Sequence, residues 1–316
     1  MKKLAVGIDI GGTNTVFGLV DNEGYCFAES SVKTGAYPDI NEYVNVVSNG
    51  IRELLQSLKD CELIGIGIGA PNGNYYKGTI EFAPNLKWKG IVPLAELFHE
   101  ELNLPVILTN DANAAAYGEM VYGNAKGMKD FMVVTLGTGV GSGLVVNGEM
   151  VYGHDGFAGE VGHTTVFPGG RMCGCGRKGC LEAYCSAGGI VDTYFEILDS
   201  KGIEHGEKNE DINPKTIYDL AKSGDESALE TYNKTGEILG MALTNSVAHL
   251  SPEAIFLFGG ITNSGPMIFD PIYKSFEENL LPIYKNKIKI APSGVKANEA
   301  AILGAASLIW KQELKS

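Results

Sequence analysis

The sequence predicts an internally duplicated α/β protein of two lobes. Short apolar strands alternate with helical segments along the chain, which is typical of a mixed α/β class. A strand, a glycine-rich turn and a second strand begin at Leu4-Ala-Val-Gly-Ile-Asp9, and the same plan returns at Phe131-Met-Val-Val-Thr-Leu136. Because 316 residues exceed what a single hydrophobic core usually holds, we expect each copy to open one lobe.

The remaining elements follow from hydrophobic periodicity and from turn residues. In the first half we expect strands over 4–9, 16–20, 63–69 and 105–109, a hairpin turn over 21–24, and helices over 41–58 and 112–121. In the second half we expect strands over 131–136, 144–146, 254–258 and 288–291, with a glycine turn over 137–143 and a hairpin at Asn147-Gly148. We expect mostly helix over 181–198, helices over 216–222 and from 226 to 250, and a closing helix over 299–314. The segment 202–213 is expected to be an exposed loop.

Charge and hydropathy exclude two classes of partner. The formal net charge of −13 repels nucleic acid, although backbone N–H groups can still bind the phosphates of a nucleotide. No apolar stretch has the length of a membrane span, and Asp9 interrupts the first apolar run too early for a signal peptide. We therefore expect a cytoplasmic protein with neither nucleic-acid nor membrane partners.

Two glycine-rich turns have the composition of phosphate-binding loops. In Asp9-Ile-Gly-Gly-Thr13 the glycines expose backbone N–H groups, Thr13 adds a hydroxyl donor, and Asp9 is placed to hold Mg²⁺ through water. Gly137-Thr-Gly-Val-Gly141 repeats the pattern without the acid. A plain hairpin turn with a solvated aspartate is the alternative for either loop alone, but two loops in matching positions favour the binding of a triphosphate.

Other nucleotide motifs are absent or misplaced. The sequence contains no Gly-Lys-Ser/Thr, which excludes a Walker-type loop. Gly65-Ile-Gly-Ile-Gly-Ala70 matches a dinucleotide-binding fingerprint, but its glycines alternate with isoleucines inside a predicted strand. We interpret that match as accidental.

A cluster of cysteines predicts a structural zinc site. Cys173, Cys175 and Cys180 lie in one glycine-rich segment, and His163 lies ten residues before the first of them. A set of three cysteines and one histidine closes a tetrahedron around zinc and leaves no position for a catalytic water. Buried free thiols or a disulfide pair are the alternatives, and Cys185 is a further but less suitable ligand because it lies in the following helix.

Three acids stand beside these motifs. Glu160 precedes His163 by one short turn and Glu182 follows Cys180 by two residues, so zinc would hold both carboxylates where they can accept hydrogen bonds from sugar hydroxyls. Asp111 begins an alanine-rich helix, whose dipole favours its ionised form. Helix capping is the alternative role for Asp111, but Asn110 can already act as the cap.

These residues resemble the ROK family of sugar kinases, in particular its bacterial glucokinase branch, over nearly the whole chain. The segments that carry the resemblance are Asp9-Ile-Gly-Gly-Thr-Asn14, Leu108-Thr-Asn-Asp-Ala-Asn-Ala-Ala-Ala116, Gly137-Thr-Gly-Val-Gly-Ser-Gly143, Glu160-Val-Gly-His163 and Cys173-Gly-Cys-Gly-Arg-Lys-Gly-Cys-Leu-Glu182.

The resemblance implies an actin-like, ribonuclease H-like duplicated fold with a hinge cleft and a zinc knuckle. The implied lobes are residues 1–117, joined by the C-terminal helix from about 300 to 316, and residues 118–299. It also implies ATP with Mg²⁺ as donor, structural Zn²⁺, a hexose phosphorylated at its 6-hydroxyl, and a homodimer or homotetramer.

The resemblance further implies site residues, with Asp111 as the acceptor of the hydroxyl proton. The sugar would be held by Asn85, Asn110, Asp111, Glu160, His163 and Glu182. The nucleotide would be held by Asp9, Gly11, Gly12, Thr13, Asn14, Gly137, Thr138, Gly139, Gly259 and Gly260, and the zinc by His163, Cys173, Cys175 and Cys180.

The chain departs from the family at Gly69-Ala-Pro-Asn72-Gly73, where many members have Gly-Xaa-Pro-Gly, so an additional side chain is expected beside the sugar pocket. Rival functions are a kinase for N-acetylmannosamine, fructose or another hexose, a sugar-responsive repressor built on the same core, and a catalytically inactive sugar-binding module. The zinc segment speaks against fructose, the acidic charge against a DNA-binding repressor, and intact Asp9 and Asp111 against an inactive module.

Overall fold

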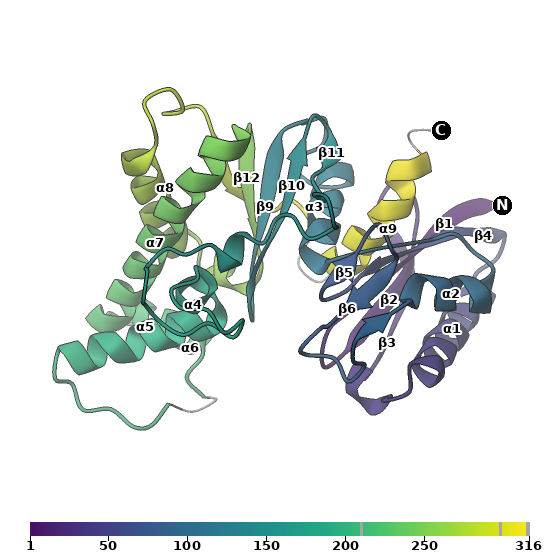
Figure 1. The fold of residues 1–316 in the computed structure, drawn as a ribbon, viewed down its shortest axis with the longest axis horizontal. Coiled ribbons are helices and arrows are strands. Elements are labelled where there is room, and N and C mark those ends of the chain that lie inside the picture. The colour runs from purple at the N-terminus through teal and green to yellow at the C-terminus, as the bar shows by residue number, and fades with distance from the viewer. Residues whose placement is uncertain (209–210, 297–298, 314–316) are drawn as a thin grey trace. The chain divides into compact units, whose positions relative to one another are not determined.

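The computed structural model describes residues 1–208, 211–296 and 299–313 (Figure 1). The chain forms two compact units, one of Met1–Met128, Gly143–Gly159 and Ser293–Ser316, and one of Lys129–Ser142 and Glu160–Pro292. The division into a lobe of residues 1–117 with the C-terminal helix and a lobe of residues 118–299 stays a prediction. The predicted end of the closing helix at 314 and residues 209–210 of the predicted loop lie outside the described residues.

A five-stranded sheet in the order β3-β2-β1-β4-β8 organises the first unit. Its strands are β1 Lys2–Ile10, β2 Thr15–Val20, β3 Cys26–Val32, β4 Cys61–Gly69 and β8 Val106–Thr109. The first three are antiparallel neighbours, whereas β4 runs parallel to β1 and β8 parallel to β4. The unit also contains a small sheet of β5 Gly73–Asn74, β6 Thr79–Glu81 and β7 Ile91–Val92, and the helices α1 Ile40–Gln56, α2 Leu94–Leu102, α3 Asp111–Val121 and α9 Ala300–Glu313, with a 3₁₀ turn at Thr34–Ala36.

The second sheet repeats the first, in the order β11-β10-β9-β12-β13. Its strands are β9 Phe131–Leu136, β10 Val140–Val146, β11 Glu149–Met150, β12 Ala254–Phe258 and β13 Lys289–Pro292. The remaining helices are α4 Glu182–Cys185, α5 Ala187–Ser200, α6 Pro214–Lys222, α7 Glu226–Leu250 and α8 Pro266–Asn279, with 3₁₀ turns at Val161–His163 and Gly260–Ser264. The matching strand orders confirm the predicted duplication and the two-lobed actin-like fold.

Local turn chemistry explains where the elements start and stop. The predicted hairpin at Asn147-Gly148 is confirmed, since both residues have positive φ (54° and 77°) and join paired strands β10 and β11. Strand β10 begins at Val140 rather than at 144, so the glycine turn is shorter than predicted. The helix predicted over 181–198 breaks at Ser186, whose side chain caps α5 by accepting the N–H of Gly189.

Close packing explains why helix α7 has glycine at two of its positions. A Cβ at Gly236 would lie 2.6 Å from Cγ of Pro271, and one at Gly240 would lie 2.3 Å from the carbonyl oxygen of Ile272. Both contacts are with α8, which was not predicted. Strand β3, helix α2 and the small sheet β5-β6-β7 were missed as well, because they are short or weakly periodic.

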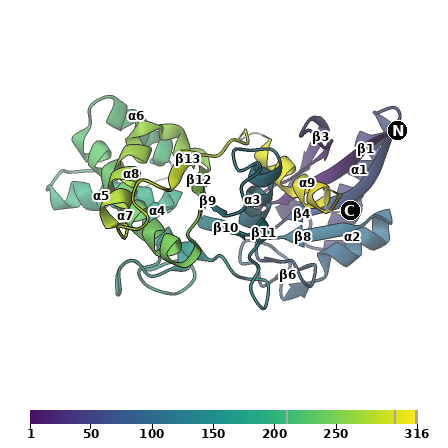
Figure 2. The same cartoon turned by 90° about the horizontal axis from the view of Figure 1, so that it is seen from above.

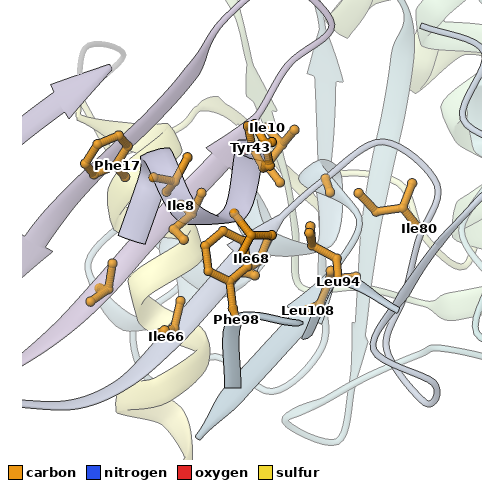
Figure 3. Packing of buried hydrophobic residues seen from close by; sticks show 14 of the residues in the cluster. Ile8, Ile10, Phe17, Tyr43, Ile66, Ile68, Ile80, Leu94, Phe98 and Leu108 are labelled. Atoms are coloured by element: carbon orange, nitrogen blue, oxygen red, sulfur yellow. The ribbon is translucent and has the colours of Figure 1, made fainter. Parts of the chain in front are cut away.

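The core of the first unit follows from strand alternation (Figure 3). Ile8 and Ile10 of β1 and Ile66 and Ile68 of β4 are buried in one cluster with Phe98 of α2. Successive side chains of a strand point to opposite faces, so the residues between them, including Asp9, belong to the other face of the sheet.

Helix α9 covers that other face at unusually close range, beside α3 (Figure 2). A Cβ at Gly7 would lie 2.1 Å from the carbonyl oxygen of Ile302, and one at Gly67 would lie 1.9 Å from that of Ala305. The alternating glycines of β4 therefore provide room for a helix, which confirms that their match to a dinucleotide fingerprint is accidental. Within the described residues, no helix has the length and apolar character needed to span a bilayer.

Gly67→Ala is expected to lower the free energy of unfolding by about 3 kcal/mol or more, because the new methyl group would overlap a helix backbone rather than a flexible side chain. Urea denaturation measures the change. Gly35→Ala is the matched control, since a Cβ there would meet no atom within 4 Å. Equal stabilities of the two variants would contradict the packing argument.

Candidate active site

Two carboxylates meet at the carboxyl edge of the first sheet. Asp9 lies near the end of β1, and Asp111 is the first residue of α3, directly after β8 and Asn110. A Cβ at Gly69, the last residue of β4, would lie 3.5 Å from Oδ1 of Asp9 and 3.7 Å from Cα of Asp111. The two acids thus surround the same glycine, at the strand ends where α/β folds place ligands.

Asp111 is not needed as a helix cap. Oδ1 of Asn110 accepts the N–H of Asn113 at 2.7 Å and caps α3, as predicted. Oδ1 of Asp111 accepts the N–H of Ala112 at 2.8 Å, while solvent still reaches the side chain. The surrounding protein atoms raise the pKa of Asp111, against this hydrogen bond, so desolvation opposes the helix dipole that is predicted to favour the ionised form.

The pKa of Asp9 is raised as well. Burial, and then the negative charge of Asp111, raise the pKa of Asp9 to about 7. A divalent cation would remove this conflict, because a positive charge beside paired carboxylates favours their ionised forms. The donor set therefore fits the predicted role of Asp9 toward Mg²⁺.

Asp9→Asn is expected to stabilise the protein by about 1–3 kcal/mol at pH 8. The carboxyl titrates near 3.8 when unfolded and near 7 when folded, so the folded protein holds the additional proton between these values. The stability of the wild type therefore falls as pH rises through this window, whereas the amide does not titrate. Urea denaturation from pH 4 to pH 8 without divalent cations tests this, and a difference between the variants that is independent of pH would contradict it.

The first glycine turn presents its residues to solvent. The N–H of Gly11 donates to the carbonyl oxygen of Asn14 at 2.9 Å, which closes the turn, and Gly12, Thr13 and Asn14 are exposed. A Cβ at Gly12 would lie 2.9 Å from the carbonyl oxygen of Asn85. Asn85, the predicted sugar ligand, is therefore held against the predicted phosphate loop.

Asn72 has a structural role. It adopts a positive φ of 52°, its side-chain amide donates to the carbonyl oxygen of Glu81 at 3.0 Å, and its own carbonyl oxygen accepts the N–H of Glu81 at 3.1 Å. The departure from the family pattern thus secures the end of β6.

The second glycine turn is joined to the predicted sugar ligands of the second unit. The N–H of Gly137 donates to the carbonyl oxygen of Gly139 at 3.0 Å, and the N–H of Val140 donates to Oε2 of Glu182 at 3.0 Å. A Cβ at Gly162, between Glu160 and His163, would lie 1.9 Å from the carbonyl oxygen of Val140. Val140, which the sequence did not single out, therefore connects the turn to both acidic segments.

The predicted zinc ligands converge. The ligand atoms of His163, Cys173, Cys175 and Cys180 all lie within 4.8 Å of one another. Nδ1 of His163 lies 3.7 Å from Sγ of Cys173, and Sγ of Cys175 lies 3.7 Å from Sγ of Cys180. Zinc–sulfur bonds of about 2.3 Å in a tetrahedron imply sulfur–sulfur edges of about 3.8 Å, so the geometry fits Zn²⁺.

Residues around this knuckle support the assignment. Cys185 belongs to the core instead, where burial raises the pKa of its thiol and its Sγ lies 3.7 Å from the carbonyl oxygen of Thr235. Arg177 donates to the carbonyl oxygen of the ligand His163, and Arg171 donates to both carboxylate oxygens of Glu196. Sequence reasoning missed both arginines, because their partners are distant along the chain.

A cavity of about 510 Å³ opens beside the second glycine turn. Its volume is typical of small-molecule sites. It is lined by Leu136, Gly137, Thr138, Ala187, Asn213, Pro214, Lys215, Tyr218, Asp219, Tyr232, Gly260, Ile261, Asn263 and Ser264. Gly259 adjoins this lining and must be glycine, since its φ is 120° and a Cβ there would lie 2.1 Å from the carbonyl oxygen of Leu136.

The predicted residues thus form two groups, one in each unit. The first unit contains Asp9, Gly11, Gly12, Thr13, Asn14, Asn85, Asn110 and Asp111. The second contains Gly137, Thr138, Gly139, Glu160, His163, Cys173, Cys175, Cys180, Glu182, Gly259 and Gly260.

Comparison with known proteins gives consistent matches over nearly the whole length. The ROK family model matches residues 5–312. A glucokinase of Halalkalibacterium halodurans is 35% identical, over 98% of this chain and 95% of the relative. The crystal structure of a ROK family glucokinase from Streptomyces griseus in complex with glucose and AMPPNP has a TM-score of 0.79 and 31% identity, over 96% of this chain and 98% of that chain.

A regulator is similar too. The xylose repressor of Bacillus spizizenii is 32% identical, over 96% of this chain and 76% of the repressor.

Proposed function

Because the chain belongs to the ROK family, we propose that it is an ATP-dependent kinase that phosphorylates a hexose, with glucose as the first candidate, at the 6-hydroxyl. The observation that carries this proposal is the pair of acids at the edge of the first sheet, where Asp111 starts α3 and is released from capping by Asn110. A binding protein has no evident need for a proton acceptor at this position. The glucose and AMPPNP bound by the related glucokinase support the choice of substrates.

Asp111 accepts the proton of the attacking hydroxyl. Solvent reaches its carboxylate, one oxygen of which is oriented by the N–H of Ala112. Asn85, Asn110, Glu160, His163 and Glu182 orient the sugar through its other hydroxyls. Nδ1 of His163 faces the cysteine ligand Cys173, so its Nε2 remains for a hydroxyl.

The two glycine turns bind the phosphates through backbone N–H groups, and the 510 Å³ cavity takes the nucleoside. When bound beside Asp9, Mg²⁺ supplies neutralisation of the phosphate charge. Zinc has no chemical step here, since its four protein ligands close the site, and the knuckle instead positions Glu160 and Glu182. We place the enzyme in the cytoplasm, as a homodimer or homotetramer.

The similarity to a xylose repressor favours a second candidate, a sugar-responsive regulator that binds sugar without turnover. A kinase for N-acetylmannosamine or another hexose is the alternative within the enzyme class.

A coupled ADP-release assay over glucose, fructose, mannose, xylose and the N-acetylhexosamines, with Mg-ATP and with polyphosphate as donors, separates these functions. Preferred turnover of glucose with ATP supports the proposal. Turnover of another sugar makes that sugar the proposed substrate in place of glucose. Saturable binding of a sugar without turnover supports the regulator.

A further inference from the structure

Glu119, near the C-terminal end of α3, is a fully buried acid that the proposed reaction does not use, with 0% of its surface exposed. Acidic side chains are rarely buried without a partner. No lysine or arginine forms an ion pair with it in the described part of the chain. Its position therefore needs another explanation.

Backbone and hydroxyl donors from two distant segments satisfy this carboxylate. Oε1 accepts the N–H of Asn124 at 2.6 Å, and the N–H of Gly294 lies 3.0 Å from Oε1 and 3.1 Å from Oε2. The hydroxyl of Ser293 donates to Oε2. A Cβ at Gly123 would lie 2.5 Å from the carboxylate carbon, so the first segment wraps closely around it.

These two segments adjoin places where the chain passes between the units. Such passages follow Met128, Ser142, Gly159 and Pro292. Asn124 precedes the first passage by four residues, whereas Ser293 and Gly294 come directly after the last. One carboxylate thus holds the chain at two of the four passages.

A carboxylate of the second unit, Glu253, fixes the chain directly after the first passage. Oε1 of Glu253 accepts the N–H groups of Lys129 at 3.0 Å and Asp130 at 3.3 Å. Only residues 125–128 lie between the two anchored points, and they include Gly127 with a φ of 86°. A change in the orientation of the units at this passage is therefore confined to a few backbone angles.

Helix α3 connects these anchors to the candidate proton acceptor. Asp111 begins the helix and Glu119 follows eight residues later, a rise of about 12 Å. A Cβ at Gly118 would lie 3.0 Å from Cα of Gly304, so α3 packs tightly on α9 and is expected to move as a rigid body.

We propose that Glu119 is a positioning residue, which transmits the orientation of the two passages through α3 to Asp111 and so couples sugar binding to nucleotide binding. This inference rests on the proposed kinase function. The negative charge is the essential property, because an amide would turn an N–H₂ group toward donors.

The test is the coupling between ligands, measured by isothermal titration calorimetry. The Kd of AMPPNP is determined with and without saturating glucose, or with the sugar that the wild type turns over. The wild type is expected to bind AMPPNP at least about fivefold more tightly when sugar is present. Glu119→Gln is expected to abolish most of this factor while each ligand alone binds with an affinity within about threefold of the wild type.

Asp21→Asn is the matched control. Asp21 is a buried carboxylate of the same unit that also accepts backbone N–H groups, those of Glu23 and Tyr25, and it pairs with Lys2. The substitution leaves unchanged its backbone carbonyl oxygen, which accepts the hydroxyl of Tyr122. The variant should lose comparable stability and keep the coupling. Ser293→Ala removes one donor and should weaken the coupling less than Glu119→Gln, and it serves alone if Glu119→Gln fails to fold.

Three results would overturn the inference: no coupling in the wild type, undiminished coupling in the Glu119 variant (or in Ser293→Ala if it stands alone), or equal loss in Asp21→Asn. Because the readout is binding, a wild type that couples both ligands without turnover would refute only the kinase function.

Discussion

Asp111→Asn is expected to lower kcat about 10²–10⁴-fold without disturbing the fold. The amide keeps an oxygen that can accept the N–H of Ala112, and Asn110 still caps α3, so helix and stability are preserved. What is lost is the group that takes the hydroxyl proton. KM for the sugar should change little, because the other sugar ligands remain.

The pH profile gives an independent check. Since the pKa of Asp111 is raised, wild-type kcat should fall as pH decreases through that pKa, where the acceptor becomes protonated. Asp39→Asn is a suitable control, because Asp39 is another acid at a helix N-terminus of the same unit and caps α1. A value of kcat within about threefold of the wild type in Asp111→Asn would exclude this role.

The sequence allowed Asp111 and the zinc ligands to be located because their patterns are local. Asn110 and Asp111 before an alanine-rich run predict a capped helix with one spare acid. The close spacing of Cys173, Cys175 and Cys180 predicts a metal knuckle before any tertiary contact is known. Both predictions were confirmed at the level of geometry.

Features that depend on tertiary contacts were not predictable in this way. Gly7 and Gly67 look like ordinary strand glycines until α9, about 240 residues or more away along the chain, packs on them. Glu119 reads as a surface acid of a helix, yet its donors come from residues 124, 293 and 294. The raised pKa of Asp111 was not predicted either, because desolvation by the surrounding protein atoms opposes the local helix dipole.

Removal of zinc is expected to unfold the knuckle and to raise KM for the sugar and for ATP. Residues 160–181 form only a short 3₁₀ turn and two isolated β-bridges, Thr165 with Cys180 and Met172 with Lys178. A structural zinc site of this kind contributes on the order of 10 kcal/mol of folding free energy. Glu160 and Glu182 would then lose their positions.

The loss of zinc should also weaken nucleotide binding, because Oε2 of Glu182 accepts the N–H of Val140 directly after the second glycine turn. Cys175→Ser tests this with metal content, limited proteolysis and KM for sugar and ATP, and Cys61→Ser, a cysteine of the first unit outside the cluster, is the control. We expect only the Cys175 variant to lose zinc, become cleavable within 160–181 and show a raised KM for both substrates. A variant that lost zinc but kept both KM values would show that the knuckle positions neither Glu182 nor the glycine turn, and the two carboxylates of the second unit would then need another source of order.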